Sequence, residues 1–159
     1  KPGMIFTSIL LIIYWTKTNK IINFYQGLEN KKNLFKTLGI ISAIFLVIHS
    51  LLLGVKFDND LYKFFRRFVL LSFIIFEVIA QSLLVYRLFK LKSFMMKHIN
   101  NYVLTLKIIL VTILVLVALI SLPIVVTSGN THLKHALEWN YFLGVIIFYL
   151  LTYLFWRRS

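Results

Sequence analysis

The stretch FVLLSFIIFEVIAQSLLVY, residues 68–86, is an apolar run long enough to cross most of a bilayer. It carries Glu77 and Gln81 near its middle. A carboxylate in hydrocarbon is costly, so it must be paired, be protonated or face a polar interior. The stretch therefore predicts a membrane-spanning helix and makes Glu77 the first candidate functional residue.

Further apolar runs flank this one along the chain. Each long run is close to the roughly 20 residues that a spanning helix needs. The four long candidate spans are 37–55, 68–89, 103–126 and 137–156. A fifth run, 4–16, is short for a span, and it could be the tail of a longer span, a tilted short helix or an interfacial helix.

The composition agrees with a membrane protein. The chain of 159 residues is 60% hydrophobic and 14% charged, whereas soluble domains have about 45–50% apolar and about 25% charged residues. We expect an all-α fold, a polytopic transmembrane helical bundle that forms a single domain over residues 1–159. The chain has no cysteine, which excludes disulfides, thiol catalysis and cysteine-ligated metals.

The net charge of +13 lies mainly between the apolar runs. Lysines and arginines placed there orient spans and contact anionic lipid headgroups, so we expect a membrane surface as partner and not nucleic acid. The positive-inside bias places 17–36, 90–102 and the C-terminus on the cytoplasmic or matrix face, although the basic loop 56–67 fits poorly. The segment 17–36 is interpreted as a solvated basic loop, with a membrane-surface amphipathic stretch as the alternative. The residues expected to contact headgroups are Lys31, Lys32, Arg87, Lys90 and Lys92.

Glu77 and Gln81 are spaced i, i+4 and share a helix face. His49 reaches a similar depth, and Lys107 could pair with Glu77, approach Gln81 or extend to the interface. These four residues are predicted to form a buried polar cluster. The cluster could bind protons or lipid headgroups, but an interhelical hydrogen bond worth about 1 kcal/mol is the favoured interpretation, because proton relays use several acids. His49 is the one histidine at membrane depth, which argues against bis-histidine haem.

His132, His135 and Glu138 form an H-x-x-H-x-x-E pattern before the last run. On a helix they could hold a divalent metal, but a polar cap on the last span is favoured. The sequence has no Gly-rich phosphate loop, nucleophile elbow or paired carboxylates. We therefore expect no catalytic activity, no cofactor and no metal.

Three further places resemble one membrane-protein family. They are the hexapeptide QSLLVY at 81–86, the S-G-N at 128–130, and the last run with Glu138-Trp139, Gly144 and 148–153. Over about residues 66–156 they are similar to the DRAM family, the damage-regulated autophagy modulators, with its Sfk-type and GPI-lipid-remodelling relatives. The resemblance implies a six-span bundle of which this chain supplies the last four or five spans. It also implies a non-enzymatic protein of endosomal, lysosomal or plasma membranes that binds or organises lipid.

Two other functions remain open. A short bundle rich in Ile, Phe, Lys and Asn suits a structural accessory subunit of a large membrane complex, such as a respiratory assembly of the mitochondrial inner membrane. A small proton-coupled transporter is the third hypothesis. The lack of broken helices or an inverted repeat in the sequence argues against it.

Overall fold

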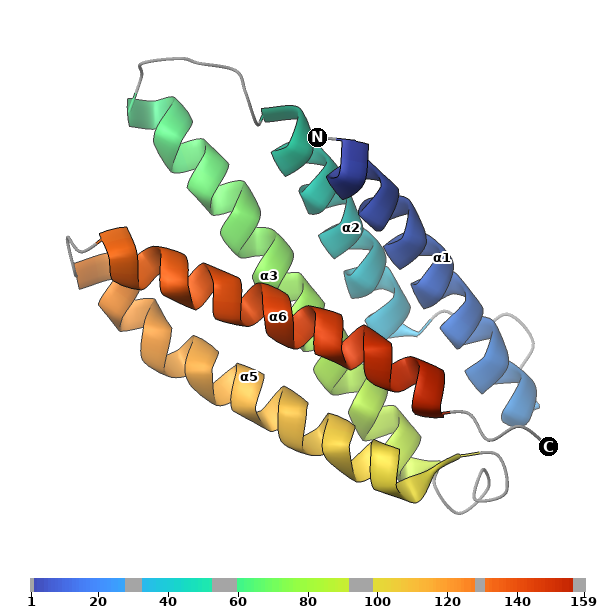
Figure 1. Ribbon diagram of the computed structural model, residues 1–159. Helices are drawn as coiled ribbons and strands as arrows, with labels where there is room; N and C mark the ends of the chain where they lie inside the picture. The colour runs from blue at the N-terminus through green and yellow to red at the C-terminus, as the bar shows by residue number, and fades with distance from the viewer. Residues whose placement is uncertain (1, 28–32, 53–59, 92–98, 128–130, 156–159) are drawn as a thin grey trace. The chain divides into compact units, whose positions relative to one another are not determined.

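The computed structural model describes residues 2–27, 33–52, 60–91, 99–127 and 131–155, and within them the side chains of all but 60, 63, 120–127, 131–138 and 142. This described part is helical (Figure 1). Its helices are α1 Pro2–Tyr25, α2 Leu34–Leu52, α3 Asp60–Lys90, α5 Asn101–Thr127 and α6 Thr131–Phe155. The expected all-α fold is therefore observed.

Three of these helices contain stretches long and apolar enough to cross a membrane. The stretches are Leu34–Leu52, Phe64–Lys90 and Asn101–Leu119. Trp139–Phe155 is a shorter apolar stretch. The three long stretches indicate an integral membrane protein.

Several helices extend beyond the apolar runs from which they were predicted. Helix α3 begins eight residues before the expected 68, and α6 begins six residues before the expected 137. Helix α1 continues to Tyr25 and α2 begins at Leu34, so the interpretation of 17–36 as a loop is wrong for residues 17–25 and 34–36. A helix satisfies its backbone hydrogen bonds internally and can therefore continue through polar residues once it has left the apolar region.

The chain divides into two compact units, Lys1–Leu83 and Leu84–Ser159, with the boundary inside α3. The expectation of a single transmembrane domain over 1–159 stays a prediction.

In the first unit, α1 and α2 form an antiparallel pair (Figure 1). The buried residues of α1 lie three or four positions apart, in two places with a directly adjacent residue as well, which gives one continuous stripe along the helix. They are Ser8, Leu11, Trp15, Thr18, Asn19, Ile22 and Asn23. The buried residues of α2 are Phe35, Gly39, Ser42, Ala43, Leu46, His49 and Ser50.

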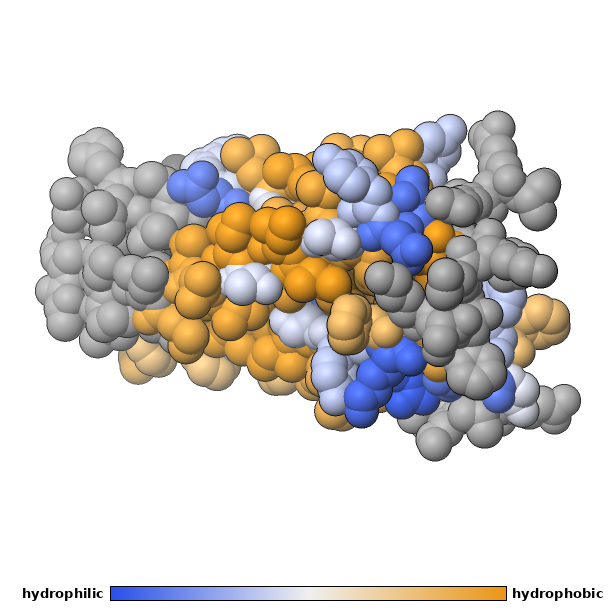
Figure 2. Space-filling view, turned by 90° about the horizontal axis from the view of Figure 1, so that it is seen from below, coloured by the Kyte–Doolittle hydropathy of each residue, from blue (hydrophilic) through white to orange (hydrophobic). Residues whose placement is uncertain are grey.

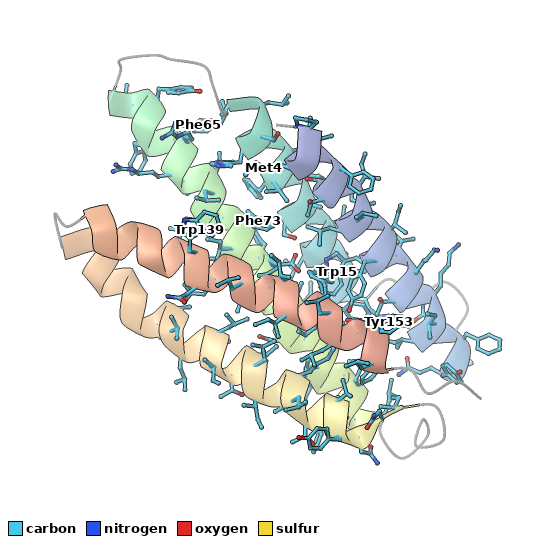
Figure 3. All side chains as sticks on the ribbon, viewed as in Figure 1. Met4, Trp15, Phe65, Phe73, Trp139 and Tyr153 are labelled. Atoms are coloured by element: carbon cyan, nitrogen blue, oxygen red, sulfur yellow. The ribbon has the colours of Figure 1, made fainter. Side chains whose placement is uncertain are left out.

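Trp15 occupies the centre of this pair (Figure 3). It is 0% exposed, and its ring centre lies 6.2 Å from that of Phe35. A β-carbon added at Gly39 would overlap the Trp15 indole. Glycine at this position therefore provides the space for the largest side chain of the pair.

Helix α2 also contacts the first part of α3. The rings of Phe45 and Phe76 are stacked, with centres 5.6 Å apart and planes 9° from parallel. The Tyr62 hydroxyl donates a hydrogen bond to the carbonyl oxygen of Leu52, at 2.5 Å. These contacts fix the register in which α3 presents Glu77 to α2.

In the second unit, α5 packs against α6. Gly144 lies opposite Leu114, whose Cδ2 would be 2.5 Å from an added β-carbon. The Tyr141 hydroxyl donates to the Leu114 carbonyl at 3.3 Å, and the Asn100 amide donates to the Phe155 carbonyl at 3.0 Å. Hydrogen bonds to backbone oxygens thus hold the pair near its middle and at the end where α5 begins and α6 ends.

The outward faces of the helices are apolar. In the view of Figure 2, hydrophobic residues cover most of the coloured surface. Large side chains are exposed on every helix, among them Leu10, Ile44, Ile75, Ile113 and Leu150. Soluble monomers rarely expose contiguous apolar surface of this extent. Lipid is the environment that such faces fit.

Candidate functional site

Glu77 lies at the centre of a hydrogen-bonded polar group in the first unit. Because α3 is continuous from Asp60 to Lys90, Gln81 falls one turn after Glu77 on the same face. Gln81 Nε2 donates to Glu77 Oε1 at 3.1 Å, and the Ser42 hydroxyl is hydrogen-bonded to Glu77 Oε2 at 2.5 Å. All three side chains are 0% exposed. The group therefore joins α3 to α2 by a polar contact sealed from solvent.

The position of Glu77 along α3 places it midway between two arginines. It lies ten residues after Arg67 and ten before Arg87, which is about 15 Å from each along a helix. The two arginines are then about 30 Å apart, which matches the thickness of a bilayer's hydrocarbon core. With an arginine at each interface, Glu77 would lie near the membrane midplane.

The amide of Gln81 is only partly satisfied. Its Nε2 is used on Glu77, whereas its Oε1 is buried and has no hydrogen-bond donor in the described part of the chain. A buried carbonyl oxygen without a donor costs about 1–3 kcal/mol. The local arrangement is thus organised around the carboxyl group of Glu77 and not around the best hydrogen bonding of Gln81.

His49 is buried on the same face of α2 as Ser42, seven residues further along. Seven residues are two helical turns, about 10 Å. The structure shows a hydrogen bond from α2 to Glu77 at Ser42. The expected pairing of His49 with Glu77 stays a prediction.

Lys107 belongs to the second unit, where its ammonium group is held between α5 and α6. Its Nζ donates to Thr152 Oγ1 at 2.6 Å and lies 4.2 Å from the ring centre of Phe148 and 5.2 Å from that of Phe155. The residue is 1% exposed, so the side chain does not extend to the surface. A hydroxyl oxygen and two aromatic faces together provide negative partial charge around this cation.

The residues expected at lipid headgroups are described in part. Arg87 is half-buried and Lys90 is exposed at the end of α3. Lys90 Nζ lies 4.8 Å from the ring centre of Tyr86, which is itself exposed. Lys31, Lys32 and Lys92 lie outside the described residues.

The weak metal candidate falls in the first turns of α6. The backbone from Thr131 is helical, as the pattern of His132, His135 and Glu138 requires. Their side chains lie outside the described ones. Among the side chains that are described, no group of three His, Cys, Asp or Glu residues could hold a metal.

A cluster of three asparagines was not anticipated. Asn33 Nδ2 donates to Asn19 Oδ1 at 2.7 Å and to Asn23 Oδ1 at 2.9 Å. All three are buried, and Asn33 directly precedes α2. The i, i+4 spacing of Asn19 and Asn23 was a visible signal, but the long-range partner Asn33 was not.

Ser42 and Thr152 were also missed as partners of Glu77 and Lys107. A hydroxyl in an apolar helix commonly bonds its own backbone, as Ser82 does with the Val78 carbonyl at 2.7 Å. Sequence spacing does not reveal which hydroxyl faces a charged residue on another helix.

Comparison with known proteins found no matching family model, curated protein or solved structure.

Proposed function

We propose that this chain is a non-enzymatic, multi-pass membrane protein that binds and organises anionic lipid. In this proposal α6 and the apolar part of α1 cross the membrane together with the three long apolar stretches. The basic end of α3 then lies at the cytoplasmic face, as the positive-inside rule favours.

The arrangement of the last turn of α3 carries the proposal. Tyr86 and Phe89 are exposed, and Arg87 and Lys90 stand beside them. Aromatic rings at headgroup depth anchor a helix, and a lysine or arginine near an anionic surface contributes about 1 kcal/mol. Lys90 Nζ lies 4.8 Å from the Tyr86 ring centre, which keeps the ammonium group close to the helix end, where the proposal places the lipid phosphate groups.

The resemblance to the DRAM family supports the same class of function. It favours a lipid-handling role in endosomal, lysosomal or plasma membranes. The segment that carries much of that likeness, residues 81–86, ends at Tyr86, the ring that Lys90 covers.

Lipid retention tests the proposal. The protein is reconstituted in mixed bilayers of phosphatidylglycerol and phosphatidylcholine, extracted in mild detergent, and examined by native mass spectrometry. We expect wild type to retain phosphatidylglycerol preferentially. The double variant Arg87→Gln with Lys90→Gln should weaken that preference about thirtyfold, from about 1 kcal/mol for each of the two removed charges. The matched control, Arg87→Lys with Lys90→Arg, keeps both charges and should behave as wild type.

Equal phosphatidylglycerol retention by wild type and the double Gln variant would contradict the proposal. A mild-detergent extraction of native membranes tests the accessory-subunit hypothesis. Migration of the chain in a stoichiometric high-mass complex would favour that hypothesis over an independent lipid-organising protein.

A further inference from the structure

The hydroxyl of Ser42 lies between two oxygen atoms that accept hydrogen bonds. Its Oγ is 2.8 Å from the carbonyl oxygen of Gly39 and 2.5 Å from Glu77 Oε2. A serine hydroxyl has one hydrogen to donate, and a carbonyl oxygen has none. An ionised carboxylate also only accepts. With Glu77 ionised, the single hydrogen of Ser42 would have to be shared between the two acceptors, which weakens both hydrogen bonds.

A proton on Glu77 gives each of the two contacts its own hydrogen. Glu77 Oε2 then donates to Ser42 Oγ, and Ser42 donates its own hydrogen to the Gly39 carbonyl. The second carboxyl oxygen, Oε1, still accepts from Gln81 Nε2. Both distances at Ser42 are then ordinary O–H···O hydrogen bonds.

We propose that Glu77 is a proton-binding site, occupied by a proton in the folded protein at neutral pH, with Ser42 as the acceptor of that proton's hydrogen bond. The proposal does not depend on lipid binding by the end of α3. It assigns a ligand, the proton, to the residue that the sequence marked first.

The surroundings of Glu77 within the first unit fit a neutral acid. On α3 no other charged residue occurs between Phe68 and Tyr86. On α2 the titratable group on the same face is His49, two turns beyond Ser42. The buried stripe of α1, which packs on α2, contains no charged side chain. A carboxyl group that is 0% exposed near the bilayer midplane has a large desolvation cost when ionised.

Infrared spectroscopy of the full chain in lipid vesicles tests the proposal. A protonated carboxylic acid has a C=O stretch that ionised carboxylates lack, and ¹³C-labelled glutamate shifts the bands of Glu29, Glu77 and Glu138 away from those of aspartate. We expect a labelled C=O band at neutral pH in wild type and in the control Glu138→Gln. It should be absent in Glu77→Gln. A wild-type spectrum without the band at neutral pH would overturn the proposal.

Two further variants keep the test independent of how Glu77→Gln folds. Gln81→Leu removes the donor to Oε1, the carbonyl oxygen of the acid, so the C=O band should remain and move to higher frequency. An unmoved band would place the proton on another glutamate and overturn the assignment. If the band is absent in wild type and present in His49→Asn, Glu77 is ionised with His49 as its counter-ion, which also overturns it.

Discussion

At the scale of single residues, the interior of each helix pair depends on matched side chains. Gly39 leaves space for the indole of Trp15 in the first unit, and Gly144 leaves space for Leu114 in the second. Lys107 has the Thr152 hydroxyl as an oxygen partner inside an apolar pair. The small size of each glycine and the burial of the Lys107 ammonium group are thus explained by a neighbouring residue on the other helix of the pair.

Gly39→Ala should separate α1 from α2. The added methyl group would overlap the Trp15 ring, which is rigid and fully buried, and overpacking of this kind costs about 1–3 kcal/mol. Thermal unfolding in detergent, followed by circular dichroism, measures the loss. Gly3→Ala is the matched control, since nothing lies within 4 Å of a β-carbon there. Equal midpoints for the two variants would show that the Trp15 contact is not formed as described.

Gly144→Ala should cost less than Gly39→Ala. The nearest atom to its added β-carbon is Leu114 Cδ2, at 2.5 Å, and a leucine methyl group can move by a rotamer change where an indole cannot. The same unfolding measurement ranks the two variants. A larger loss for Gly144→Ala would contradict this reasoning.

Thr152→Val should destabilise the second unit more than Lys107→Met does. Valine removes the hydroxyl that accepts from Lys107 and leaves the buried ammonium with the two aromatic rings, a loss of about 1–3 kcal/mol. Methionine removes the charge and keeps the volume, which is often tolerated. Combining both changes should recover much of the stability that Thr152→Val loses. Additive losses in this double-mutant cycle would mean that the two side chains do not interact.

At the scale of helices, the sequence located the centres better than the ends. The run 103–126 lies within two residues of α5, and 37–55 lies within three of α2. The expected start of α3 was eight residues late, because hydropathy detects where a helix is apolar and α3 begins with the charged segment DLYKFFRR. The end of α1 was missed for the same reason, since Lys17 and Lys20 lie on its exposed side.

The pairing of helices was harder to predict from the sequence. In a soluble protein, apolar residues at steps of three and four reveal the buried face of a helix. Here the opposite face of α1 carries Phe6, Ile9 and Ile13, which are exposed and equally apolar. Hydropathy therefore does not distinguish the buried face of α1, which contains Trp15, from its exposed face. The shared buried face of Glu77 and Gln81 was predictable, because two polar residues stand out in an otherwise apolar helix.

The junction of α1 with α2 gives a prediction at this scale. Asn33→Ser places another favoured capping residue before α2, but serine is too short to bridge Asn19 and Asn23. We expect a loss of about 1–3 kcal/mol and faster amide exchange in the last turns of α1. Exchange unchanged from wild type would show that Asn33 acts on α2 only as a cap.

At the scale of the whole molecule, apolar side chains face outward, and buried polar side chains such as Glu77 and Lys107 have hydrogen-bond partners within their own unit. Exposed Ile75 and buried Glu77 lie two residues apart on α3. A protein folded in water would reverse this arrangement. This arrangement predicts that α3 crosses a bilayer with Glu77 near its middle.

The absence of natural cysteines makes that claim directly measurable, since single-cysteine variants need no background replacements. Leu61→Cys and Phe89→Cys lie at exposed positions near the two ends of α3, and Ile75→Cys lies at an exposed position near Glu77. The measurement is labelling by a membrane-impermeant maleimide in intact and in lysed bacterial spheroplasts. We predict that Leu61→Cys reacts in intact spheroplasts, Phe89→Cys only after lysis, and Ile75→Cys in neither. Reaction of Leu61→Cys and Phe89→Cys from the same side, or of Ile75→Cys as fast as Leu61→Cys, would contradict a membrane-spanning α3.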